Sequence, residues 1–272
     1  MNETINGKKV VTEYNSIAEF YNYLCKTPFN EVFRWKEHSS VNGSVSFTKT
    51  ANFEEAVDLM KNGWTDMAQK LTNVLKVKEQ KLAYVNRRKN VNSVAGFQPI
   101  VPLYLAGAPC NMVATKVVPV KQKVLNIVKS VDYAALVSSD KIVDESVKAM
   151  MLVKKFEAQG YRVNLYIAIG SVTNSKKMFA KVKIKGANEK LNVSKLAFPL
   201  VHPSMLRRLF FRFIEVHPEI TDDFAYGYGR PATAYELKSM FPDCVTIPAI
   251  LKTPLEQIKV VDDLEGLEGV EY

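Results

Sequence analysis

Two His-Pro pairs flank an aromatic segment that carries three arginines, in the stretch HPSMLRRLFFRFIEVHP at residues 202–218. Histidines can ligate a metal or transfer protons, and arginines can bind phosphates. On one helix, His202 and His217 would lie about 22 Å apart, because each residue advances the chain by about 1.5 Å. Two imidazoles at that separation cannot share a metal ion. The arginines are therefore the candidate functional residues of this stretch.

Basic side chains provide the main candidate for ligand binding. The formal net charge is +9 over 272 residues, which favours polyanion partners. The predicted nucleic-acid interface consists of Lys181, Lys183, Lys185, Arg207, Arg208, Arg212, Tyr226, Tyr228 and Arg230. Strict alternation in MFAKVKIKG, residues 178–186, would place its lysines on one face of a strand, and tyrosines beside an arginine can stack on bases.

A structural interpretation is open for each of these groups. Lysines also guard the edge strands of sheets, and this is slightly favoured for residues 178–186. Arginines also line the flank of a buried helix, and Gly-Tyr segments such as FAYGYGRP commonly form tight loops that pack on a sheet. Function therefore depends on whether folding gathers the basic residues into one patch.

Motifs for catalysis or cofactor binding are missing from the sequence. The glycines lack the spacing of a phosphate-binding loop, and neither HExxH nor GxSxG occurs. The three cysteines, Cys25, Cys110 and Cys244, form no CxxC pair. We therefore expect no cofactor, no metal and no assigned catalytic residue, although catalytic groups can also assemble from distant positions. Enzymatic activity stays open, with a non-enzymatic role favoured.

The first half is predicted to be mainly helical, because apolar residues recur every three or four positions. Helices are expected over residues 16–27, 52–62 and 65–90. VNGSVSFTKT, residues 41–50, is expected to form a short strand or hairpin with Asn42–Gly43 as its turn. Three prolines in residues 96–112 favour an ordered connector over a helix.

The second half alternates strands and helices. Strands are predicted at residues 112–120, 123–131, 161–170, 178–186 and 244–250, and a helix at 141–159. Strand, helix and strand between residues 123 and 170 predict a βαβ unit with parallel strands. The predicted domains are a mainly α N-terminal region with a small hairpin (1–111), an α/β domain (112–252) and an acidic C-terminal tail (253–272).

From residue 123 to about 250, this order of elements resembles a von Willebrand factor A-like domain. The resemblance implies a Rossmann-like mixed sheet flanked by helices, with an antiparallel strand after the βαβ unit. Ion-binding members carry Asp-x-Ser-x-Ser after the first strand. Here Asp132 matches the aspartate, but Ala134 and Leu136 replace the serines and offer no oxygen ligand. The resemblance therefore implies a degenerate, empty metal position.

Four segments, GFQPIVPLYLAGAP, FEAQGYRVNLY, HPSMLRRLFFRFIE and FAYGYGRP, are similar to uncharacterised tailed-bacteriophage proteins. This resemblance implies a non-enzymatic phage protein in the host cytoplasm or the virion, acting as a binding scaffold for protein or nucleic acid. The alternatives are direct nucleic-acid binding through a basic face and an enzyme of unassigned chemistry. No apolar run reaches the roughly 18 residues of a membrane span, so no membrane partner is expected.

Overall fold

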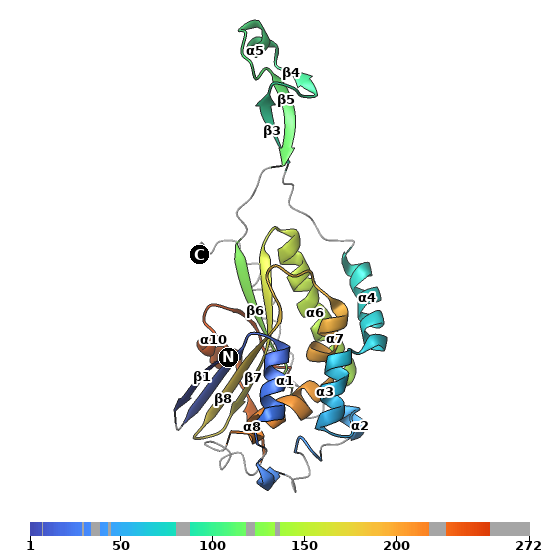
Figure 1. Cartoon of the computed structure of the whole chain (residues 1–272), viewed down its shortest axis with the longest axis vertical. Helices are drawn as coiled ribbons and strands as arrows, with labels where there is room; N and C mark the ends of the chain where they lie inside the picture. The colour runs from blue at the N-terminus through green and yellow to red at the C-terminus, as the bar shows by residue number, and fades with distance from the viewer. Residues whose placement is uncertain are drawn as a thin grey trace.

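The computed structural model describes residues 1–6, 8–28, 30–33, 39–42, 45–79, 88–117, 123–133, 137–217 and 227–250. Within these ranges the chain forms a mixed α/β body with a Rossmann-like arrangement and an arm that stands away from it (Figure 1). The acidic tail predicted at 253–272 lies outside the described residues. None of the described helices combines the length and the apolar character needed to traverse a bilayer.

Seven strands make up the large sheet of the body, in the order β1-β2-β8-β7-β6-β10, with β9 beside β7. Their bounds are β1 Asn2–Asn6, β2 Lys9–Tyr14, β6 Val124–Ser130, β7 Arg162–Val172, β8 Lys177–Lys185, β9 Arg230–Pro231 and β10 Val245–Ile247. Strand β6 is parallel to β7 and β10, whereas β8 is antiparallel to β7 and parallel to β2. The sheet is therefore mixed, as the fold-class prediction states.

The predicted βαβ unit is confirmed as β6, helix α6 (Ser139–Ala158) and β7. Ser138 caps α6 by accepting a hydrogen bond from the Lys141 amide at 3.4 Å. At the other end Gly160 adopts a φ of 96°, which an L side chain rarely takes, and the chain enters β7 directly. The Ser138 cap and the Gly160 turn thus define the two ends of α6 within this unit.

Helices cover the two faces of the sheet unequally (Figure 1). The principal core joins one face to α6 and to α1 (Ile17–Lys26), α3 (Phe53–Asn62), α4 (Thr65–Glu79), α7 (Val193–Val201), η2 (Met205–Phe210) and α8 (Phe211–Glu215). A smaller cluster on the opposite face includes Leu237 of α10 (Ala234–Met240), Phe241 and Cys244. Within the quoted stretch, residues 203–215 therefore form a core helix, in which η2 is a π-helical segment.

Two local predictions for the first half and one for the second half are wrong. Residues Val45–Thr48 form the short helix α2 rather than a strand, and a 3₁₀ turn, η1, precedes it at Glu31–Phe33. Helix α4 is described only to Glu79, and residues 88–90, predicted as the end of this helix, begin a strand at Arg88–Ser93. Strand β8 is not at the sheet edge, because the N-terminal hairpin β1–β2 adds two strands beside it.

The arm comprises β3 (Arg88–Ser93), β4 (Gln98–Pro99), α5 (Val101–Leu105) and β5 (Met112–Val117), in the sheet order β3-β5-β4. Its strands pair with one another and with no strand of the large sheet. The proline-rich connector expected at 96–112 thus contains a short helix and forms the end of a hairpin. Pairing crosses the predicted boundary at residue 112, and the division into domains stays a prediction.

Candidate functional site

The predicted lysine row lies on the face of the sheet that α10 covers, but it holds only two lysines. Lys181 forms an ion pair with Glu13 at 2.8 Å, and its ammonium lies 4.8 Å from the centre of the Phe241 ring. Lys183 lies 5.5 Å from the centre of the Tyr166 ring. These contacts hold the stems of both lysines against the sheet.

Lys185 points to the opposite face, because a β-bulge breaks the alternation of β8. Leu165 pairs with Lys185 and Tyr166 with Lys183, which leaves Ile184 as the extra residue. The Lys185 ammonium is buried, where it lies 2.7 Å from Glu157 and donates to the Val163 carbonyl at 2.9 Å. The expectation that all three lysines share one face is therefore wrong.

Arg208 connects the core helix to the segment that precedes α3. Its side chain is fully buried and donates to four main-chain carbonyls at 2.8–3.1 Å, those of Ser40, Val41, Thr50 and Ala51. A guanidinium presents donors in a fixed planar arrangement, so one side chain can bind several carbonyls at once. Arg208 therefore joins two segments of the fold.

Glu215, also buried, anchors the same segment from α8. It accepts from the Ser40 amide at 2.7 Å, from the Ser40 hydroxyl, and from the Tyr228 hydroxyl at 2.5 Å. Ser40 thus bonds to the carboxylate through its amide and hydroxyl and to Arg208 through its carbonyl. Arg208 and Glu215 are therefore linked through Ser40, and each buried charge has hydrogen-bond partners inside the protein.

The two other arginines of this helix contact aromatic rings. The Arg207 guanidinium lies 5.2 Å from the centre of the Phe211 ring and 5.7 Å from that of Tyr133. Arg212 is buried, with its guanidinium 4.5 Å from the centre of the Phe53 ring. All three arginines therefore make their described contacts within the body.

The Gly-Tyr segment contributes to the same packing. Tyr228 stacks on Phe211 with ring centres 3.8 Å apart, and Arg230 binds Glu236 at 2.8 Å. Tyr226 lies outside the described residues. The eight residues of the predicted interface that the structure describes do not gather into one patch, and the binding of nucleic acid by the nine residues stays a prediction.

Asp132, the position matched to the degenerate ion motif, is buried just after β6. One carboxylate oxygen accepts from the Ser130 hydroxyl and from the Gly170 amide, both at 2.9 Å. Burial raises the pKa of Asp132 from 3.8 to about 7, although these two hydrogen bonds oppose the shift. The carboxylate thus organises the ends of two neighbouring strands.

Lys129 and His202 border a closed cavity near Asp132, on the principal-core side. Burial lowers the pKa of Lys129 to about 8 and that of His202 to about 4. The His202 ring stacks on Phe198 with centres 4.8 Å apart. The cavity measures about 10 Å³, the space of roughly one water molecule. Lys129 and His202, both with lowered pKa values, therefore border a space in which the described residues leave little room for a substrate.

The raised pKa of Asp132 predicts a pH effect on stability. Between pH 4 and 7 the folded protein retains a proton that the unfolded chain has released, so this group makes stability fall as pH rises. His202 acts in the opposite direction over much of that window, because its pKa is lowered. Relative to wild type, Asp132→Asn should therefore gain stability from pH 4 to pH 7.5, on the order of 4 kcal/mol.

Urea unfolding of both proteins at several pH values measures this difference. His202 is common to both proteins, so its titration cancels. A constant difference across the window would show that Asp132 is ionised in the fold at low pH, contrary to the prediction.

Metal ligands do not cluster in the described part of the chain. No three His, Cys, Asp or Glu side chains there lie close enough together to hold an ion. Ala134 and Leu136, which replace the serines of the ion motif, lie outside the described residues.

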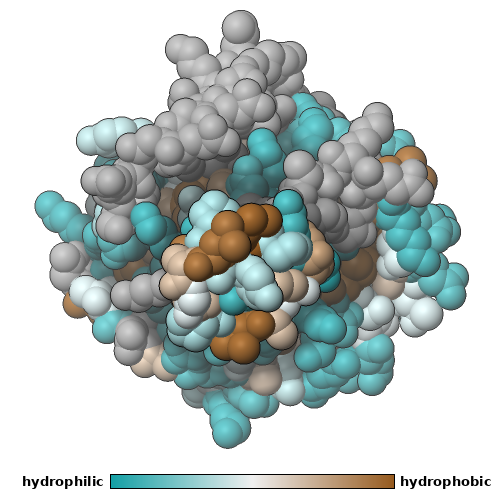
Figure 2. All heavy atoms as spheres, turned by 90° about the horizontal axis from the view of Figure 1, so that it is seen from above, coloured by the Kyte–Doolittle hydropathy of each residue, from teal (hydrophilic) through white to brown (hydrophobic). Residues whose placement is uncertain are grey.

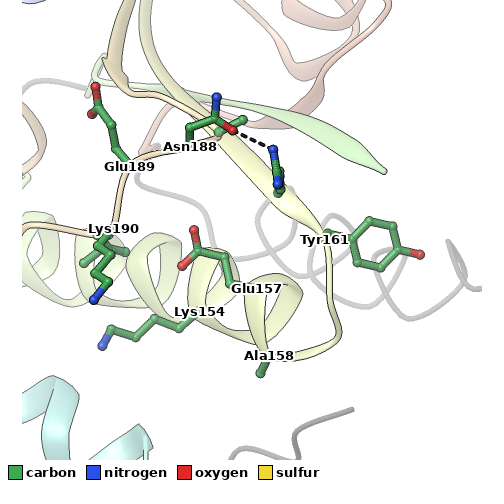
Figure 3. Close-up of a pocket in the computed structure, with 10 residues that line it drawn as sticks. Lys154, Glu157, Ala158, Tyr161, Asn188, Glu189 and Lys190 are labelled. Atoms are coloured by element: carbon green, nitrogen blue, oxygen red, sulfur yellow. Dashed lines mark hydrogen bonds between the residues drawn. The ribbon is translucent and has the colours of Figure 1, made fainter. Parts of the chain in front are cut away.

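An open hollow lies at the other end of the sheet, where the parallel strands begin (Figure 3). It measures about 840 Å³ and is formed by the end of α6, the start of β7 and the turn after β8. Lys154 and Lys190 extend to the same side of it, and Tyr161 points away from them. Arg162 donates to Asn188 at 2.8 Å, which joins the start of β7 to the turn after β8.

A second hollow of about 310 Å³ shares Glu189 and Lys190 with the first and adds Lys195 near the start of α7. The two acidic residues of the pair of hollows are engaged locally. Glu157 binds Lys185, and Glu189 accepts from the Gly186 amide at 3.3 Å. Besides the buried Lys185, four basic residues rim this concave end: Lys154, Arg162, Lys190 and Lys195.

Sequence reasoning missed this rim because its residues come from separate elements. Lys190 and Lys195 follow β8 in GANEKLNVSK, which has no regular pattern, whereas Arg162 begins a strand interpreted only for its apolar run. A usable signal was the βαβ unit itself. Its parallel strands begin at the same sheet end, so their flanking basic residues must meet there.

Comparisons with known proteins identify one family. The model described as Domain of unknown function (DUF7192) matches residues 2–258, which include the body strands from β1 to β10 and the whole arm. No curated protein and no solved structure matches the chain. The match covers nearly the whole sequence, and the chain therefore belongs to the family described as Domain of unknown function (DUF7192).

Proposed function

We propose that this protein is a non-enzymatic binding scaffold whose concave basic end takes a polyanion, with nucleic acid as the favoured partner. The observation that carries the proposal is the pair of adjoining hollows rimmed by Lys154, Arg162, Lys190 and Lys195. Phosphates are bound by cations held on a rigid frame, and here helices and strands of the body supply that frame.

The chemistry inside the body supports a scaffold rather than a catalyst. The buried ionisable groups Arg208 and Glu215 bind main-chain atoms of the segment before α3, and Asp132 binds the end of β7. Each of these contacts stabilises the fold. The open hollow, in contrast, offers basic side chains to solvent, and the net charge of +9 adds a long-range attraction for polyanions.

The proposal also includes a fold family and an origin for the protein. A von Willebrand A-like sheet is supported by the succession of β6, α6 and parallel β7, followed by antiparallel β8. Asp132 at the end of β6 also agrees with that resemblance. A tailed-phage origin, with action in the host cytoplasm or the virion, is supported by the four sequence segments that resemble phage proteins.

Charge reversal of the rim tests the function. We expect Lys154→Glu, Lys190→Glu and Lys195→Glu together to weaken binding of a fluorescent DNA duplex at low salt by roughly a hundredfold or more, because each lost phosphate contact removes counterion release. The matched control carries Lys26→Glu, Lys61→Glu and Lys70→Glu, which change the net charge equally on α1, α3 and α4.

The control should lose much less affinity than the rim variant. Equal losses would assign binding to net charge alone and refute a specific basic end. Unmeasurable binding of wild-type protein to both DNA and RNA at low salt would refute the proposed function itself.

A further inference from the structure

The end of the arm exposes hydrophobic residues that nothing in the described chain covers. Five large apolar side chains, each between 58 and 78% exposed, are gathered there: Val94, Phe97, Val101, Tyr104 and Leu105. Figure 2 looks down on this end and shows hydrophobic residues at the surface nearest the viewer. Exposed apolar residues scattered singly are ordinary, but a cluster on a projecting hairpin indicates a contact surface.

The charge pattern of the arm changes sharply along its length. Residues 90–115 contain no Asp, Glu, Lys or Arg, whereas Arg88, Lys89 and Lys116 stand where the hairpin approaches the body. Lys89 and Lys116 are direct cross-strand partners, and both are exposed. Like charges placed opposite each other destabilise a strand pair. Their presence is explained if an anionic surface meets the base of the arm.

We propose that the arm docks on an anionic lipid bilayer, with its apolar end inserted among the headgroups and Lys89 and Lys116 bound to lipid phosphates or carboxylates. Peripheral proteins bind bilayers through such a combination of shallow apolar insertion and basic residues at the surface. The five apolar side chains supply the first part, and the lysine pair supplies the second.

The arm's composition favours lipid over the other occupants. A hairpin lying in a nucleic-acid groove is flanked by phosphates along its length, and residues 90–115 carry no cation to meet them. A second copy of this arm would offer the Lys89–Lys116 pair no anion, because residues 90–115 contain no Asp or Glu. This proposal departs from the expectation of no membrane partner, which rested on the lack of a spanning segment, because surface docking requires no such segment.

Flotation of the full chain with liposomes tests the proposal. Liposomes of phosphatidylcholine with an equal part of phosphatidylserine should bind wild-type protein, and pure phosphatidylcholine should bind it much more weakly. Phe97→Ser with Leu105→Ser should reduce binding by at least roughly tenfold, because two inserted side chains are lost. Lys89→Gln with Lys116→Gln should reduce binding to the anionic liposomes by roughly thirtyfold.

The control for apolar exposure is Val77→Ser with Tyr235→Ser, two exposed residues of the body. Its binding should equal that of wild type, and all variants should keep the wild-type unfolding midpoint. The proposal is overturned if wild-type protein fails to float, or if the arm variants bind as wild type does. It is also overturned if the arm variants abolish self-association in sedimentation velocity, or DNA binding, while liposome binding persists.

Discussion

Arg208→Met is expected to lower the free energy of unfolding by about 4 kcal/mol, near the upper limit for a single substitution. Methionine keeps an apolar chain of similar reach but leaves the carbonyls of Ser40, Val41, Thr50 and Ala51 without these donors. Buried acceptors without donors are costly, because the unfolded chain would bond them to water. Urea unfolding followed by circular dichroism gives the value.

Arg230→Met is the matched control for this prediction. Arg230 also binds a carboxylate, that of Glu236, but its side chain is 53% exposed. An exposed ion pair contributes at most about 1 kcal/mol. Similar losses for the two arginines would contradict the assignment of Arg208 as the internal link between the core helix and the segment before α3.

Glu215→Gln is expected to lower the free energy of unfolding by about 3 kcal/mol, although it is almost isosteric. The carboxylate accepts from the Ser40 amide, the Ser40 hydroxyl and the Tyr228 hydroxyl, and an amide supplies one oxygen where two are used. The substitution also removes a negative charge that interacts with both Arg208 and Arg212. Guanidinium-induced unfolding of the Glu215→Gln variant, alone and combined with Arg208→Met, measures the change in the free energy of unfolding.

Combining Glu215→Gln with Arg208→Met should cost less than the sum of the separate losses, since both act through Ser40. The exposed carboxylate Glu189 supplies the control, and Glu189→Gln should change stability by less than about 0.5 kcal/mol. Strict additivity of the Arg208 and Glu215 variants would show that the two side chains act independently.

The sequence was sufficient for the elements whose signals are local. The apolar period of α6, the apolar run of β7 and the alternation at the start of β8 predicted a βαβ unit followed by a strand, and the structure confirms them. Each of these signals arises from burial of one face, which a period of 3.6 or 2 records in the chain itself.

The predictions that were wrong depend on contacts between distant residues. Strand β8 was interpreted as an edge, but β2, more than 160 positions earlier, pairs with it. Lys185 was assigned to the lysine row, but the bulge opposite Leu165 and Tyr166 turns it toward Glu157. Period two predicts a face only while the pairing register is continuous, and the register is set by the partner strand.

The arginines of the core helix show that candidate functional residues, too, could not be assigned from sequence patterns alone. In sequence, Arg208 and Arg212 resemble an exposed basic flank, because an apolar stripe occupies the other positions of the helix. Their partners, Ser40, Thr50 and Phe53, come from a segment more than 150 residues away. No periodicity in one helix can indicate that a second segment covers its polar side.

The salt dependence of DNA binding tests the central claim most directly. With Lys154→Gln, Lys190→Gln and Lys195→Gln together, the slope of log affinity against log salt should be shallower than that of wild type by about 3, one unit for each lost phosphate contact. Slopes that are equal for the two proteins, over a salt range in which both bind, would show that the concave basic end is not the binding site.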